Sequence, residues 1–317
     1  MTGECSPIFV IGAPRSGTTL LRVMLSSHSK IYIPPESDFI PRLFLRRGQV
    51  PMTKQKALEN IRVILRNRRF FREWKGEPLD TEAFVGGLSD MSPSNFLDAL
   101  YRAYAAQYGA TRWGDKSPIY TNYVGLITEI FPQAQIVHLI RDGRDAALSS
   151  LSAYRDRFYV DVYFAARSWR KRVRASQHAG ATLGPGRYIE IRYEELTAHP
   201  EHVLRSVCRF LGESYEPAMS EPHRLGRELL RPKGRHAPVR DPVHPNSDRW
   251  RREMAPADLR LFQEVAGDLL RDLGYETVDL GTMSMRERTR RSRLATKYGV
   301  VEGGRRVLQA TGIFHPH

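Results

Sequence analysis

A glycine-rich segment near the N-terminus has the residue types of a phosphate-binding loop. Four residues separate Gly12 from Gly17, and a short apolar run precedes them. A turn of this kind between a strand and a helix directs backbone N–H groups and the positive helix end at a phosphate. A Walker A loop has the same spacing, but the position of its lysine is occupied here by Thr18. The pattern therefore predicts an anion cradle without the lysine of nucleotide triphosphatases, although an ordinary turn that needs glycine only for steric reasons is the alternative. The side-chain donors of the cradle would be Arg15, Ser16, Thr18 and Thr19.

A second candidate anion site follows the most apolar strand-like segment, residues 134–140. Arg141 comes directly after this segment, and Ser149 lies eight residues further on, in an expected helix. Ligands of open α/β sheets bind at the carboxyl ends of the strands, so both side chains could reach one anionic group. The alternative is a charged surface turn, in which Asp142 and Asp145 pair with Arg141 and Arg144. Two anion cradles in one sheet predict a nucleotide that carries phosphates at both ends.

The elements that would hold these residues alternate between strand and helix. Residues 9–11, 134–140 and 187–193 read as strands rich in β-branched and apolar residues, and helical periodicity follows each of them. Repeated βα units predict an α/β fold with a P-loop-like parallel sheet flanked by helices. We expect a single domain over residues 1–275, with a helical insertion at 40–110 on the acceptor side and a basic tail at 276–317.

Composition limits the classes of protein and partner. The net charge of +14 over 317 residues calls for an anionic partner or a solvated basic surface. No zinc-finger, recognition-helix or aromatic-interleaved basic pattern accompanies the charge, so no specific nucleic-acid binding is expected. No apolar run approaches the ~18 residues of a transmembrane helix, and no secretory signal is visible. Cys5 and Cys208 lack metal or redox spacing, and no cluster of metal ligands is present, which predicts a cytoplasmic protein without a metal.

Several motifs together resemble the sulfotransferases that use 3′-phosphoadenosine-5′-phosphosulfate (PAPS). The resemblance covers about residues 7–275 in order. The matching segments are residues 14–19 (PRSGTT), 114–118 (GDKSP), 140–150 (IRDGRDAALSS), 192–196 (RYEEL) and 249–251 (RWR). Each motif is short, but the combination is specific. It implies an enzyme that transfers a sulfuryl group to a hydroxyl-bearing acceptor and requires no metal.

The resemblance also implies a role for individual residues in donor binding. Arg141 and Ser149 would hold the 3′-phosphate, and Tyr193 would pack near the adenine. Lys233 and Gly234, after Arg231, loosely resemble a basic loop that closes over the 3′-phosphate, although the residue order departs from the family pattern. The 5′-phosphosulfate would be held by Arg15, Ser16, Gly17, Thr18 and Thr19.

Catalysis would need cations at the leaving oxygen and a base for the acceptor. Arg15 and Lys116 are the expected cations, with a salt bridge to Asp115 or to a surface carboxylate as the alternative for Lys116. Glu36 is the expected base, because residues 36–42 resemble the Glu-x-x-x-Ile-Pro-Arg pattern of tyrosylprotein sulfotransferases. His28 and His138 are the rival bases, and either could instead be a structural histidine.

Two other functions stay open on the sequence alone. One is a P-loop kinase-like phosphotransferase, which the absence of the loop lysine disfavours. The other is a non-catalytic protein that binds a nucleotide or a polyanion. The acceptor could be a small-molecule, glycan or tyrosyl hydroxyl, and a homo-oligomer is compatible with the sequence.

Overall fold

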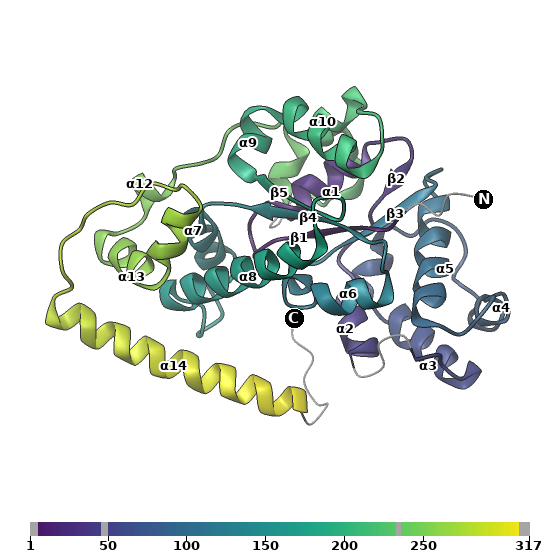
Figure 1. Ribbon diagram of the computed structural model, residues 1–317, viewed down its shortest axis with the longest axis horizontal. Coiled ribbons are helices and arrows are strands. Elements are labelled where there is room, and N and C mark those ends of the chain that lie inside the picture. The colour runs from purple at the N-terminus through teal and green to yellow at the C-terminus, as the bar shows by residue number, and fades with distance from the viewer. Residues whose placement is uncertain (1–5, 46–49, 233–235, 311–317) are drawn as a thin grey trace.

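A five-stranded parallel sheet forms the centre of the protein, with the strand order β2-β3-β1-β4-β5. The computed structural model describes residues 6–45, 50–232 and 236–310. Its strands are β1 (Ile8–Ile11), β2 (Ile31–Tyr32), β3 (Arg112–Lys116), β4 (Gln135–Ile140) and β5 (Tyr188–Arg192). The predicted α/β class with a P-loop-like parallel sheet is confirmed (Figure 1).

The two central strands are apolar because helices cover both faces of the sheet. All four residues of β1 are buried, and β4 is buried from its second residue onward. Val10 of β1 is paired in register with Lys116 on one side and with Val137 on the other. Parallel sheets of this type read as continuous apolar runs, which is why these strands were predictable.

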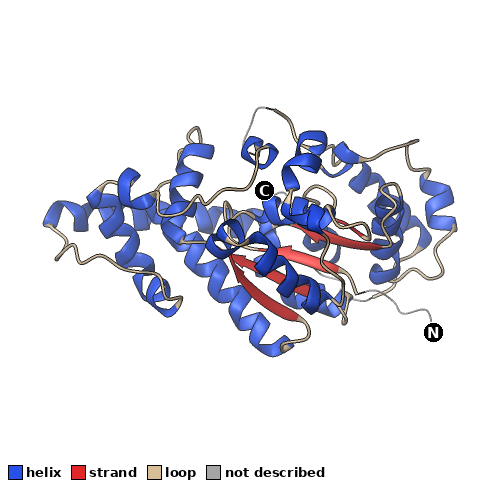
Figure 2. Cartoon of the chain, turned by 90° about the horizontal axis from the view of Figure 1, so that it is seen from above, coloured by secondary structure: helices blue, strands red, loops and turns tan. Residues whose placement is uncertain are grey.

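Figure 2 shows the sheet enclosed by helices. One face packs against α1, α9 and α10, and its core includes Leu25, Val137 and Leu204. The other face packs against α5, α6 and α8, with α7 and α13 continuing this layer beyond the end of β4. The bounds are α1 (Thr18–Ser26), α6 (Val124–Ile130), α7 (Gly143–Ala153), α8 (Val162–Leu183), α9 (Tyr193–Ala198), α10 (Pro200–Leu211) and α13 (Pro256–Asp272).

The segment between β2 and β3 is helical, in the region where the sequence predicted an insertion. Its elements are α2 (Phe39–Phe44), α3 (Lys54–Leu65), η1 (Phe70–Glu73), α4 (Thr81–Gly86) and α5 (Pro93–Ala106). Side chains of Thr53, Asp80 and Ser92 cap the N-termini of three of these helices. The stacked rings of Tyr101 and Trp113, 4.5 Å apart, join the insertion to β3. The insertion thereby becomes one wall of the space above the sheet.

Residues 213–249 hold six prolines and show little helical periodicity in the sequence, yet their described parts contain three short helices. These are η3 (Pro217–Ser220), α11 (Pro222–Leu229) and η4 (Ala237–Arg240), each with a proline in its first turn. A 3-10 helix, η2 (Pro118–Asn122), and a short helix, α12 (Trp250–Glu253), complete the body of the protein.

The basic tail is also helical. Helix α14 (Met285–Ala310) runs along the lower edge of the molecule in Figure 1 and packs against α8 and α13. Ion pairs attach it to the body, including Lys297 with Asp161 and Arg291 with Glu264. In the part of the chain that the structure describes, no helix is both long and apolar enough to cross a bilayer.

Candidate active site

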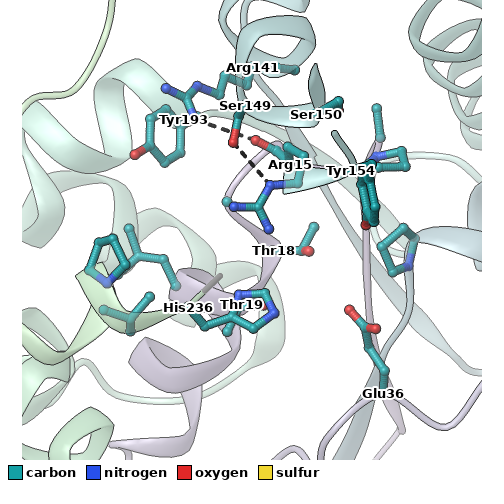
Figure 3. A pocket seen from close by; sticks show the side chains of 18 of the residues that line it. Arg15, Thr18, Thr19, Glu36, Arg141, Ser149, Ser150, Tyr154, Tyr193 and His236 are labelled. Atoms are coloured by element: carbon teal, nitrogen blue, oxygen red, sulfur yellow. Dashed lines mark hydrogen bonds between the residues drawn. The ribbon is translucent and has the colours of Figure 1, made fainter. Parts of the chain in front are cut away.

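A cavity of about 1040 Å³ opens at the carboxyl ends of β1, β3 and β4. Its lining comes from regions that are far apart in the sequence: the loop between β1 and α1, the segment between β2 and β3, the start of η2, α7 and α8 with their connection, α9, and residues 230–231 and 236–249. Figure 3 shows Arg141 and Tyr193 at one end of this cavity and Glu36 at the other. This is the edge of the sheet at which the sequence predicted ligand binding.

The loop after β1 has a backbone that depends on glycine. Gly17 has a φ of +94°, and a Cβ atom at this position would lie 2.4 Å from the ring of Tyr193. Arg15 also has a positive φ, 68°, which turns the loop back on itself. The N-terminus of α1 has no side-chain cap, so its first N–H groups point toward the loop's interior without that partner.

One side chain of the loop indicates that a ligand belongs in it. The hydroxyl of Ser16 is buried and has no hydrogen-bond partner among the described residues. A buried polar group without a partner is costly, and an anion in the turn would supply the missing acceptor. The side chains of Thr18 and Thr19 also border the cavity. The predicted phosphate cradle therefore has the donors and the shape that it needs.

The second predicted cradle lies beside the first. Arg15 Nε donates to Ser149 Oγ at 3.0 Å, which links the loop to α7. Arg141 stacks on Tyr193, 4.2 Å from the ring centre, and donates to the carbonyl of Asn246 at 2.7 Å. Its Nε is buried and has no partner within the described chain. The structure thus brings Arg15, Arg141, Ser149 and Tyr193 together, as the sequence predicted.

The charged residues next to Arg141 form some of the ion pairs that the alternative, a charged surface turn, predicted. Arg144 does not face the cavity, since it forms a bidentate pair with Asp142 at 2.7 and 3.0 Å. Asp145 lies 3.8 Å from Arg141 and accepts a hydrogen bond from the backbone of Trp250. Only the first arginine of this motif is therefore available to a ligand, and the second holds the motif in shape.

At the other end of the cavity, Glu36 contacts two cations. Lys116 Nζ lies 2.5 Å from one carboxylate oxygen of Glu36 and 3.4 Å from Thr19 Oγ1. Arg69, from the turn before η1, contacts the other oxygen. Lys116 is 3% exposed and does not border the cavity, whereas Glu36 is 9% exposed and does. The predicted lysine thus lies one layer behind the predicted base.

Burial opposes the positive charge of Lys116, whereas the carboxylate of Glu36, 2.5 Å from Nζ, stabilises it. Burial lowers the pKa of Lys116 well below its usual value, and the positive charges of Arg22 and Arg69 lower it further. The salt bridge that was the alternative for Lys116 is present, but its partner is Glu36. The contact joins two of the predicted catalytic residues, and the role of Lys116 at the leaving oxygen stays a prediction.

The structure places the two rival histidines outside the cavity. His138 is fully buried in β4, where Nδ1 lies 2.6 Å from the hydroxyl of Tyr188, and burial lowers its pKa. His28 follows α1 and lies 2.9 Å from the carbonyl of Ser214. Both are structural residues in this fold.

Sequence reasoning missed several residues that border the cavity, among them Arg69, His236 and Asn246. Burial, with the positive charges of Lys116 and Arg15, lowers the pKa of His236 to about 3. No motif marks these positions, because each comes from a connecting segment. Of the predicted basic loop, Arg231 borders the cavity, whereas Lys233 and Gly234 lie outside the described residues.

The acceptor end of the cavity is basic and aromatic. Arginines of the insertion face a second set of side chains from the α7–α8 connection and from α8. These lining residues are Arg68, Arg69, Arg72, Tyr154, Arg157, Tyr159, Phe164 and Arg172. Arg68, Arg69 and Arg72 of the insertion thus border the cavity, and the acceptor-side role of the insertion stays a prediction.

The fold and the site together define the class. A phosphate loop and a second arginine cradle lie at the carboxyl ends of parallel strands, where open α/β sheets bind their ligands. No group of three metal-ligating side chains is found in the described part of the chain. The sequence model of the sulfotransferase family matches residues 7–217. The chain therefore belongs to the sulfotransferase family, as the resemblance of its motifs predicted.

Relatives with similar sequences include proteins with named activities. An uncharacterized protein of Aquifex aeolicus is 30% identical over 78% of this chain and 30% of its own length. A protein-tyrosine sulfotransferase of Drosophila melanogaster is 24% identical over 88% of this chain. The nodulation protein NoeE of Sinorhizobium fredii is 28% identical over 87% of this chain and 68% of its own length. The chain spans only about half of the Drosophila protein, 51%.

Solved structures share the fold. The sulfotransferase domain of the Synechococcus PCC 7002 olefin synthase aligns with a TM-score of 0.58 at 24% identity, over 87% of this chain and 98% of that domain. The sulfotransferase domain of the curacin biosynthetic pathway aligns with a TM-score of 0.55 at 23% identity, over 86% and 99%.

Proposed function

We propose that this protein transfers a sulfuryl group from PAPS to the hydroxyl of an acceptor. The observation that carries the proposal is the pair of linked anion cradles, joined by the 3.0 Å hydrogen bond between Arg15 and Ser149. A nucleotide with anionic groups at its 5′ and 3′ positions fits two cradles that share a wall. An ordinary nucleoside triphosphate would need the loop lysine and would leave Arg141 without its role.

The residues of the two cradles would divide the work of donor binding. The loop and the N-terminus of α1 would hold the 5′-phosphosulfate through backbone N–H groups and through the hydroxyls of Ser16, Thr18 and Thr19. Arg141 and Ser149 would hold the 3′-phosphate. PAPS supplies the sulfuryl group and a phosphate leaving group. The ring of Tyr193, which stacks on Arg141 and borders the cavity, would pack near the adenine.

Two cations would then stabilise the charge that builds on the leaving oxygen. Arg15 borders the cavity at the loop, and Lys116 reaches Thr19 from behind it. Positioned charge of this kind supplies most of the catalysis in phosphoryl transfer, and sulfuryl transfer makes the same demands. Glu36 would accept the proton of the acceptor hydroxyl. Arg69 contacts Glu36, and its side chain is 50% exposed, so an entering acceptor can displace it.

The acceptor would be a hydroxyl compound, and the named relatives of the chain suggest more than one class of it. The comparisons include protein-tyrosine sulfotransferases and a nodulation protein. A small-molecule, glycan or tyrosyl hydroxyl remains compatible with the cavity. Five arginines line the acceptor end and give it a positive potential, which favours an acceptor without a positive charge. They are Arg68, Arg69, Arg72, Arg157 and Arg172.

Calorimetric titration tests the donor. We expect adenosine 3′,5′-bisphosphate (PAP), the product nucleotide, to bind more tightly than ATP with magnesium. Tighter binding of ATP with magnesium would instead favour the kinase-like alternative. Incubation with PAPS and an extract of the source cells, followed by a search for an added sulfuryl mass, tests the transfer itself. A protein that binds PAP but never releases it from PAPS would be a binding protein.

A further inference from the structure

A buried carboxylate lies directly behind the proposed reacting groups and has no part in the scheme above. Asp115 is the residue before Lys116 in β3 and is completely buried. One of its oxygens, Oδ2, accepts hydrogen bonds from the hydroxyls of Ser37 at 2.6 Å, Tyr101 at 2.5 Å and Tyr120 at 2.6 Å. The other, Oδ1, accepts from the backbone N–H of Lys116 at 2.7 Å.

These contacts belong to a ladder between two segments. The first segment, residues 36–38, precedes α2, and the second, residues 115–117, ends β3. Glu36 pairs with Lys116 at 2.5 Å, Ser37 with Asp115 at 2.6 Å, and Asp38 accepts a hydrogen bond from Ser117. Three consecutive residues of one segment are thus bound to three of the other by their side chains.

From this ladder we propose that Asp115 is a positioning residue, which holds residues 36–38 and therefore Glu36 in the geometry for proton transfer. The inference rests on the proposed function. Asp115 does not border the cavity, so it would act only through Ser37 and the strand. A displacement of about 1 Å at a reacting group costs up to ~10²-fold in rate, which makes such a clamp effective.

The protonation of Asp115 should control the clamp. Asp115 faces Tyr101 from α5, Tyr120 from η2, Ser37 and Asp38 from the first segment, and Lys116 along its own strand; β1 opposes it with the apolar Phe9. Burial raises the pKa of Asp115 to about 6, and the three hydroxyl donors oppose that rise. Below this pH the carboxyl group becomes protonated and can no longer accept all of its hydrogen bonds.

Two tyrosines of α5 provide a matched test. Tyr101 donates to Asp115, whereas Tyr104, one turn later and equally buried, donates to the carbonyl of Phe70 at 2.8 Å. Tyr101→Phe removes one donor from the ionised carboxylate and should move the acidic limb of kcat upward by about one pH unit, the size of one charge-assisted hydrogen bond. Tyr104→Phe should leave this limb where it is in the unmodified protein.

The assay follows PAP released from PAPS with 4-nitrophenol as a probe acceptor. Asp115→Asn should lower kcat by about ten- to a hundred-fold while PAP affinity is kept. Because burial disfavours the ionised carboxylate, this variant should not lose thermal stability at pH 8. Full activity of Asp115→Asn, or identical acidic limbs for the two tyrosine variants, would overturn the clamp.

A second readout separates this inference from the proposed function. If the unmodified protein releases no PAP from PAPS, it is the proposed transfer that fails. Hydrogen exchange at the amides of residues 37–39 then decides the clamp. We expect faster exchange in Asp115→Asn than in Tyr104→Phe, and a rise in exchange below pH 6 in the unmodified protein. Equal protection in both variants would refute the clamp.

Discussion

Substitution of Arg141 by alanine tests whether the second cradle recognises a 3′-phosphate. In the structure this guanidinium stacks on Tyr193 at 4.2 Å, donates to Asn246 at 2.7 Å and keeps a buried Nε without a partner among the described residues. A hydrogen bond to a charged group contributes about 1.5–3 kcal/mol, so loss of the phosphate contact should weaken PAP binding by about 10²-fold.

The comparison nucleotide is adenosine 5′-monophosphate, which lacks the 3′-phosphate. It should lose only the indirect effect of the missing stack on Tyr193, about 0.5–1 kcal/mol or a few-fold in affinity. The preference for PAP over adenosine 5′-monophosphate should therefore fall by more than about 10-fold. Isothermal titration at constant ionic strength measures both affinities in one buffer.

The net charge of +14 requires a control for general attraction of anions. Arg205→Ala removes one positive charge from an exposed position on α10, where Arg205 pairs with Glu201. This variant should bind both nucleotides as the unmodified protein does. Equal losses of the two nucleotides in Arg141→Ala would show that Arg141 supports the fold of the site and does not read the 3′-phosphate.

Three further substitutions test other parts of the site and of the core. Glu36→Gln should lower turnover by about 10²–10⁴-fold and preserve PAP binding, with the exposed Glu59→Gln as its control; an active Glu36→Gln would require another base. Gly17→Ala forces a side chain into a backbone with φ +94° and should weaken PAP binding by at least about 10-fold in the same titration. Glu73→Gln breaks a buried bidentate pair with Arg22 and should lower the free energy of unfolding in urea by about 3–5 kcal/mol. The pair lowers the pKa of Glu73, so its contribution is complete above the unfolded-state pKa and is lost as the pH falls through the lower, folded-state value; a variant whose deficit persists unchanged at acid pH would contradict this.

Sequence predicts those parts of the fold in which the type of a residue depends directly on its burial or on its backbone conformation. The apolar run of β4 is buried on both faces of the sheet, and the glycine spacing of the loop reflects a backbone that only Gly17 can adopt next to Tyr193. By contrast, the apolar residues 31–33 do not show where their strand ends, and β2 covers only Ile31–Tyr32. Pro34 and Pro35 end the ladder there, because proline has no N–H to donate.

Site residues were predictable where a strand places them at the edge of the sheet. Site residues that come from connecting segments were not predictable. Lys116 and Arg141 end parallel strands, and parallel strands present their carboxyl ends at one edge. Arg69, His236 and Asn246 reach the same cavity from connecting segments whose paths depend on tertiary packing. The position of Lys116 behind Glu36, away from the cavity, was also not predictable, since sequence spacing does not show which of two side chains borders a cavity.

The register of the sheet explains how a phosphate loop can function without its own lysine. Val10 of β1 pairs with Lys116 of β3, so the lysine lies beside the strand that leads into the loop. From there Nζ reaches Thr19 Oγ1 at 3.4 Å, on the first turn of α1, and pairs with Glu36 on its other side. In a Walker A loop the lysine is a free charge beside the phosphates. Here the cation is buried and bound to a carboxylate, so a proton that Glu36 takes from an acceptor would weaken its hold on Lys116 just as charge builds on the leaving oxygen.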